Sequence, residues 1–124
     1  MYTFKKEERL CNKRLIAALY RNGSSFLCYP FKVAWMPADT IEAPVQIVLS
    51  VAKKRYKRAV DRNLIKRRIR EAYRLHKQQL LYSQIPGKKI LLSISYIGKD
   101  ITEYAFMEKK MIKLLTQLSG EVLK

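Results

Sequence analysis

The sequence predicts an α+β fold in which one small sheet is packed by helices. Two observations predict it: three segments carry apolar residues at helical spacing, and short runs rich in strand-forming residues lie between them. Their order along the chain is helix, strands, long helix, strand, helix. A chain of 124 residues fits one domain, 1–124, and is long enough to bury a core without a disulfide or a metal.

A first helix is predicted at about residues 12–22, where apolar residues recur every three or four positions. Gly23 follows the segment and suits the end of a helix. The apolar face, which we expect to pack on the rest of the protein, consists of Leu15, Ile16, Leu19 and Tyr20.

Three regions have the composition of strands. Residues 25–36 are rich in β-formers, and Pro30 is expected to divide them into two short strands. Residues 45–52, VQIVLSVA, form a clear strand that is apolar enough to be well covered, and residues 89–97 form another.

A long helix is predicted at residues 60–82, and the sequence Ile85-Pro86-Gly87 ends it. Its apolar stripe at helical spacing consists of Ile65, Ile69, Ala72, Tyr73, His76 and Leu80. A last helix follows, for which Asp100 and Glu103 fit an N-cap and its capping partner. The apolar side of this last helix consists of Met107, Met111, Leu114, Leu115 and Leu118.

The charge of the chain is large and uneven. It has 26 lysines and arginines against ten acidic residues, for a net charge of +16. Residues 53–77 hold 12 of the cations and two of the acids, a net charge of +10 in 25 residues. Such a field attracts polyanions and opposes self-association, and its concentration in one segment indicates a phosphate-binding surface for nucleic acid.

The long helix places most of its cations beside its apolar stripe, within an arc of about 140° on a helical wheel. Four of them follow at i,i+4 spacing, where like charges repel by about 0.2–0.5 kcal/mol per pair, which favours a polyanion partner over an ordinary solvated face. Glu71 can pair with Arg67 or Arg74, and Arg68 points elsewhere. The arc consists of Arg62, Asn63, Lys66, Arg67, Arg70, Arg74 and Lys77.

The order of residues in this region is more specific than its charge. Residues 59–71 fit the pattern AVxRNxIKRRIRE and follow the run SVAKK at residues 50–54. Together they closely resemble the signature of the protein subunit of bacterial ribonuclease P. Arg9-Leu10 and the first helix also lie where that family has them, and the resemblance covers roughly residues 4–118.

The resemblance implies an α-β-β-β-α-β-α two-layer sandwich with a small mixed sheet, a fold shared with a ribosomal-protein domain. It also implies a left-handed βαβ crossover around the long helix, against the usual right-handed preference. In the family, a large RNA subunit using Mg²⁺ removes the 5′ leader of precursor tRNA. This chain is therefore expected to bind ribonuclease P RNA and the leader of precursor tRNA, as a cytoplasmic monomer in a 1:1 complex, and to carry neither catalytic nor metal-binding residues.

The resemblance assigns the RNA contact to the motif face of the long helix and to the basic connection before it, at one end of a leader cleft. The expected RNA-binding residues are Arg62, Asn63, Lys66, Arg67, Arg70, Arg74, Lys53, Lys54 and Arg58. The expected leader-binding residues are Ile16, Tyr20, Phe31, Lys53 and Lys54.

Single-stranded RNA is usually held by cations together with aromatic side chains on which bases stack. The residue types that offer such a platform are Tyr20, Tyr29, Phe31, Trp35 and Tyr56. Tyr20 is favoured by the resemblance, whereas Phe31 and Trp35 also fit a hydrophobic core. The alternation of the strand leaves open which sheet face lines the cleft.

The sequence departs from the family pattern at three positions. Ile16 stands where Phe is more usual, which removes one stacking surface. Lys57 stands where glycine is common, so the basic connection is expected to follow a different turn. Asp61 places an acid beside Arg62, as a local partner or as a favourable charge at the helix N-terminus.

Other functions fit the residues less well. An independent nuclease lacks support, because the one histidine, His76, lies on an apolar stripe and the ten acids are scattered. A structural RNA-binding role, as in a ribosomal protein or an RNA chaperone, agrees with the charge but does not require the RNxIKR order. A DNA-binding regulator is disfavoured because a strand, not a helix-turn-helix, precedes the long helix.

Two further observations bear on location. Cys11 and Cys28 match no zinc or redox spacing and suit packing in a reducing compartment. The first ten residues lack the apolar core of a signal peptide, and no apolar run approaches the roughly 20 residues that span a bilayer. We therefore expect a cytoplasmic protein that does not engage a membrane.

Overall fold

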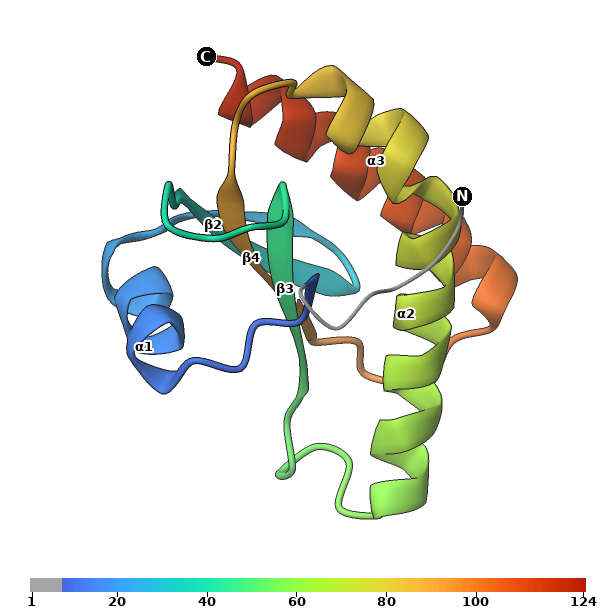
Figure 1. The fold of residues 1–124 in the computed structure, drawn as a ribbon. Helices are drawn as coiled ribbons and strands as arrows, with labels where there is room; N and C mark the ends of the chain where they lie inside the picture. The colour runs from blue at the N-terminus through green and yellow to red at the C-terminus, as the bar shows by residue number, and fades with distance from the viewer. Residues whose placement is uncertain (1–7) are drawn as a thin grey trace.

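The computed structural model describes residues 8–124, in which three α-helices surround a four-stranded sheet (Figure 1). Residues 4–7, where the family resemblance begins, lie outside the described part. The elements are α1 (Lys13–Asn22), β1 (Ser24–Cys28), β2 (Phe31–Pro37), β3 (Val45–Val51), α2 (Ala59–Leu80), the 3₁₀ turn η2 (Tyr82–Gln84), β4 (Ile90–Tyr96) and α3 (Tyr104–Val122).

The sheet is mixed, with the strand order β1-β2-β4-β3. Strands β1 and β2 form an antiparallel hairpin, with Pro30 in the turn, and β2 also pairs antiparallel with β4. Strands β3 and β4 are parallel, so α2 connects them as a crossover. In Figure 1 the chain descends β3, climbs α2 at the right and descends β4 behind β3, which makes the crossover left-handed, as the resemblance implies.

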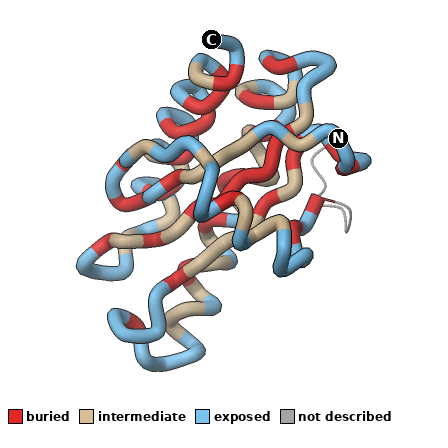
Figure 2. Tube along the Cα trace, turned by 90° about the vertical axis from the view of Figure 1, so that its left-hand side faces the viewer, coloured by how far each residue is buried: buried red, intermediate tan, exposed pale blue. Residues whose placement is uncertain are grey.

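The two faces of the sheet have different coverings. One face carries alternate residues such as Val33, Ile47 and Ile94, which pack with the buried sides of α2 and α3 in the main core. The other face carries Leu91, on which α1 packs through Leu19 and neighbouring side chains. Figure 2 shows the buried positions concentrated in the sheet and on one side of the helices. Because α1 is only ten residues long, part of this second face stays open.

Most predicted elements are confirmed within one or two residues. Asn12 caps α1 by accepting from the amides of Arg14 and Leu15 at 2.9 and 3.2 Å. The predicted capping pair of the last helix is wrong: Glu103 is the N-cap residue but makes no side-chain cap hydrogen bond. Asp100 is exposed in the preceding loop, where its backbone carbonyl accepts from the Tyr96 hydroxyl at 2.5 Å.

Lys77 does not belong to the cationic face on which the helical wheel placed it. Its side chain is 3% exposed, and its Nζ lies 2.5 Å from the Glu8 carboxylate. The Tyr82 hydroxyl donates to the other oxygen of Glu8 at 2.9 Å. The segment before α1 therefore covers the end of α2 and buries a cation that an isolated helix would expose.

Candidate nucleic-acid interface

The outer side of α2 presents the predicted cations over about two turns. Asn63, Arg67 and Arg70 are exposed, and Lys66 is half-buried. The helix can present them because Ile65 and Ile69, on its other side, are fully buried in the main core. Arginine forks on a rigid helix suit the bidentate recognition of phosphate oxygens.

Arg74 lies on the same side of α2 but is partly neutralised. Its guanidinium forms an ion pair with Glu71, one of the two partners expected for that carboxylate. This hydrogen-bonded pair holds the pKa of the Glu71 carboxyl below its usual value. Arg74 therefore offers an RNA partner less net charge than Arg67 or Arg70, whereas Arg68 turns away and donates to the backbone carbonyl of Thr102.

The basic connection at residues 52–58, which we call the basic loop, runs from the end of β3 to α2. Its five cations are all exposed: Lys53, Lys54, Arg55, Lys57 and Arg58. No residue other than glycine has a positive φ in residues 8–124, so Lys57 does not require the left-handed backbone that would favour glycine. The expected cations of this loop are thus presented beside the N-terminus of α2.

A hollow of about 330 Å³ lies between α2 and the β3 edge of the sheet. Arg9 reaches it because residues 9 and 10 pair with Ile47, whose carbonyl accepts from the Leu10 amide at 2.9 Å. Its cationic lining residues are Arg9, Lys66 and Arg70. The sequence indicated Arg9 only as part of the family motif. Its pairing with β3 places it beside α2.

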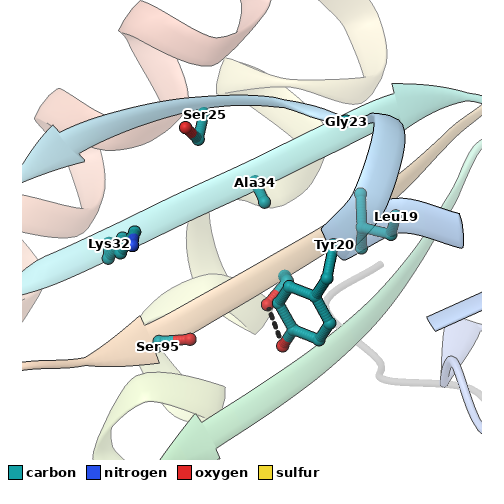
Figure 3. A pocket seen from close by; sticks show the side chains of 8 residues that line it. Leu19, Tyr20, Gly23, Ser25, Lys32, Ala34 and Ser95 are labelled. Atoms are coloured by element: carbon teal, nitrogen blue, oxygen red, sulfur yellow. Dashed lines mark hydrogen bonds between the residues drawn. The ribbon is translucent and has the colours of Figure 1, made fainter. Parts of the chain in front are cut away.

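A second hollow, of about 210 Å³, lies on the open face of the sheet beside α1 (Figure 3). Tyr20 leans from α1 over β4, and its hydroxyl lies 2.8 Å from the Ser93 Oγ. Tyr20 as a whole remains 54% exposed, so part of its surface is available to a ligand. The hollow is lined by Leu19, Tyr20, Gly23, Ser25, Lys32, Ala34, Ser93 and Ser95.

The hollow shows which face of the sheet stays open. Lys32 and Ala34 lie on the open face, and Phe31 and Val33 lie on the core face. Sequence reasoning missed Lys32, Ser25 and Ser95 as candidates, although strict strand alternation groups Lys32 with Ala34. One cation and several hydroxyls around an aromatic ring suit a nucleotide, because hydroxyls can donate to or accept from a base edge.

Phe31 was predicted to contact the leader, and the structure corrects this. Phe31 has no exposed surface and packs edge-on against Tyr96, with ring centroids 6.1 Å apart. Two other candidate platforms are also occupied: Trp35 is half-buried and its Nε1 donates to Glu121 at 3.4 Å, and Tyr56 is buried. Ile16 is half-buried in the small cluster under α1 and does not line the hollow.

Within residues 8–124, no group of three His, Cys, Asp or Glu side chains comes together that could hold a metal ion. His76 instead pairs with Glu108 of α3 at 2.9 Å and joins α2 to α3. The described helices include none with the length and apolar composition to cross a membrane.

Comparison with known proteins agrees with this geometry. A family model described as Ribonuclease P matches residues 4–119. The ribonuclease P protein component of Porphyromonas gingivalis is 34% identical over 120 residues, covering 94% of this chain and 87% of the relative. That of Picosynechococcus sp. is 35% identical over 112 residues, covering 90% of each.

Solved structures agree as well. The RNase P protein of Staphylococcus aureus superposes with a TM-score of 0.69 at 28% identity, covering 90% of this chain and 94% of that one. The RNase P protein of Thermotoga maritima, at 23% identity and a TM-score of 0.71, shares the fold. With the family model matching nearly the whole chain and relatives above 30% identity along most of it, this chain belongs to the ribonuclease P protein family.

Proposed function

We propose that this chain is the protein subunit of ribonuclease P, and that it binds ribonuclease P RNA together with the 5′ leader of precursor tRNA. The observation that carries the proposal is the placement of two hollows against one strand pair. Val48 of β3 lines the cationic hollow, Ser93 of β4 lines the hollow at Tyr20, and these two residues are paired in the sheet. Cations for a folded RNA backbone and an aromatic site for a single strand thus border the same pair of strands.

In this proposal the two surfaces bind different RNAs. The exposed residues of α2 and the basic loop neutralise phosphates of the RNA subunit, one protein binding one RNA. The open sheet face with Tyr20 and Lys32 holds the leader, and Lys53 and Lys54 lie at the end of β3 beside it. In this proposal the catalytic groups and Mg²⁺ belong to the RNA partner, as the family resemblance implies. The chain's own contribution is to bind and orient the substrate.

Reconstitution tests the proposal directly. We expect precursor tRNA to be cut at the mature 5′ end, at low Mg²⁺, only when the protein and a bacterial ribonuclease P RNA are both present. Cleavage by the protein alone would contradict the assignment of the catalytic groups to the RNA. Binding of ribonuclease P RNA without any gain in cleavage would favour the structural RNA-binding role instead.

Tyr20→Ala is expected to weaken the binding of leader-bearing precursor tRNA to the reconstituted enzyme by about 1–3 kcal/mol, the usual value of one stacked base. Mature tRNA, which has no leader, should be affected much less. Tyr29→Ala is the matched control, because Tyr29 is equally exposed at 52% but lies in the β1–β2 turn and not among the lining residues of the hollow. Equal losses for both RNAs would remove Tyr20 from the leader site.

A further inference from the structure

Arg62 belongs to the RNA-binding motif, yet its guanidinium binds the protein itself. Its Nη1 donates to two consecutive backbone carbonyls of the basic loop, those of Tyr56 and Lys57, each at 2.8 Å. The side chain is half-buried, unlike those of Arg67 and Arg70. A charged donor shared by two carbonyls restrains the backbone on both sides of one peptide unit.

The same loop is anchored from its opposite side by Tyr56. This ring is 8% exposed and packs on Tyr96, with centroids 6.0 Å apart. Its hydroxyl donates to the carbonyl of Gly98 at 2.7 Å, and Arg55 donates to the neighbouring carbonyl of Ile97. The basic loop is therefore joined to the connection that follows β4, as the parallel strands β3 and β4 end at the same edge of the sheet.

Gly98 permits this close packing. A Cβ at this position would lie 2.6 Å from the Tyr96 ring, a distance that real Cβ atoms do not adopt. Tyr96 in turn donates from its hydroxyl to the Asp100 carbonyl, so the connection after β4 is itself held to the core. The anchor that Tyr56 uses is thus rigid, and a loop bound to it loses conformational freedom before any RNA arrives.

We propose that Arg62 and Tyr56 are positioning residues that clamp the basic loop, and that RNA is bound by the loop's outward cations and not by Arg62. The inference rests on the proposed function. Five cations on a seven-residue loop repel one another. The unclamped loop would therefore sample many arrangements and would lose much of its binding to a fixed row of phosphates. The clamp orders the loop before RNA binds, so the entropy lost in ordering it does not weaken binding.

A double-mutant cycle tests the clamp. It measures the coupling between Arg62 and the loop lysines in the affinity for ribonuclease P RNA, at one fixed salt concentration. Lys53→Ala with Lys54→Ala is expected to weaken binding about tenfold in the wild-type background and less than about threefold in Arg62→Ala, since coupled residues are not additive. Arg67→Ala is the matched control: it removes one exposed arginine of the same helix, and the tenfold effect of the lysines should persist. If the fold-changes in the dissociation constant caused by Arg62→Ala and by the two lysine substitutions simply multiply, to within about twofold, in the combined variant, the clamp is overturned.

Trypsin tests the clamp without RNA, because the loop itself offers five cleavage sites after Lys or Arg. Cuts after these five residues, located by mass spectrometry, should appear several-fold faster in Arg62→Ala than in wild type or Arg67→Ala. Tyr56→Phe keeps the buried ring and loses only the Gly98 bond, and it should show a smaller acceleration. Unchanged loop cleavage in both variants would overturn the clamp. A wild-type chain that binds no ribonuclease P RNA would instead refute the proposed function and the role of the loop with it.

Discussion

Replacing Arg67 and Arg70 together by alanine is expected to weaken the binding of ribonuclease P RNA by about 10- to 100-fold at physiological salt. Both side chains are exposed on the outer side of α2, so the double variant neutralises fewer phosphates without opening the core. The slope of log affinity against log salt concentration should also become shallower, by about 0.7–0.9 for each phosphate that the variant no longer neutralises. Filter binding or fluorescence anisotropy over a salt series measures both quantities.

The matched control is Lys109→Ala with Lys113→Ala. These two residues are also exposed and also one helical turn apart, but on α3, and they remove the same charge. If long-range charge alone attracted the RNA, the two double variants would lose affinity equally. We expect the α3 variant to lose less than about threefold and to keep its salt slope. Equal losses would contradict the assignment of the RNA contact to α2.

Glu8→Ala is expected to lower the free energy of unfolding by about 3–5 kcal/mol, a large share of the stability of a domain of this size. The variant leaves the Lys77 ammonium group in a site that is 3% exposed, without its carboxylate partner. It also removes the acceptor of the Tyr82 hydroxyl. Urea denaturation followed by circular dichroism gives the free energy directly.

Two further variants make this expectation specific. Glu42→Ala removes an exposed acid and should change the stability by no more than about 0.5 kcal/mol. Glu8→Leu combined with Lys77→Met removes both buried charges at once, and it should be far more stable than Glu8→Ala alone, because neither charge is left unpaired. A loss below about 1 kcal/mol in Glu8→Ala would show that Lys77 finds water or another partner.

The element order and the cationic face of α2 could be predicted because they depend on local patterns. The alternation of β2, the strand-forming composition of β4, the apolar spacing in α2 and α3, and Gly23 after α1 each depend on a few neighbouring residues. The motif of the long helix identified the family. The left-handed crossover was predicted from the family and not from any local propensity.

What the sequence could not decide is where a charged or mixed surface of one element meets another part of the chain. Lys77 lies within the cationic arc of an isolated helix, and only the segment at Glu8 packing across α2 buries it. Phe31 and Lys32 are adjacent and point to opposite sheet faces, and only the packing of α2 and α3 on the Phe31 face shows that the Lys32 face stays open.

Arg62 shows the same limit most clearly. Its place in the motif is determined by the sequence, but the carbonyls that it binds come from a loop whose path depends on Tyr56 and Gly98, about 40 residues apart along the chain. The sequence alone thus determined the elements, the family and the surface that carries the charge. Tertiary structure alone decided which cations stay exposed and which hold the protein together, because burial and hydrogen bonding depend on contacts between residues distant in sequence.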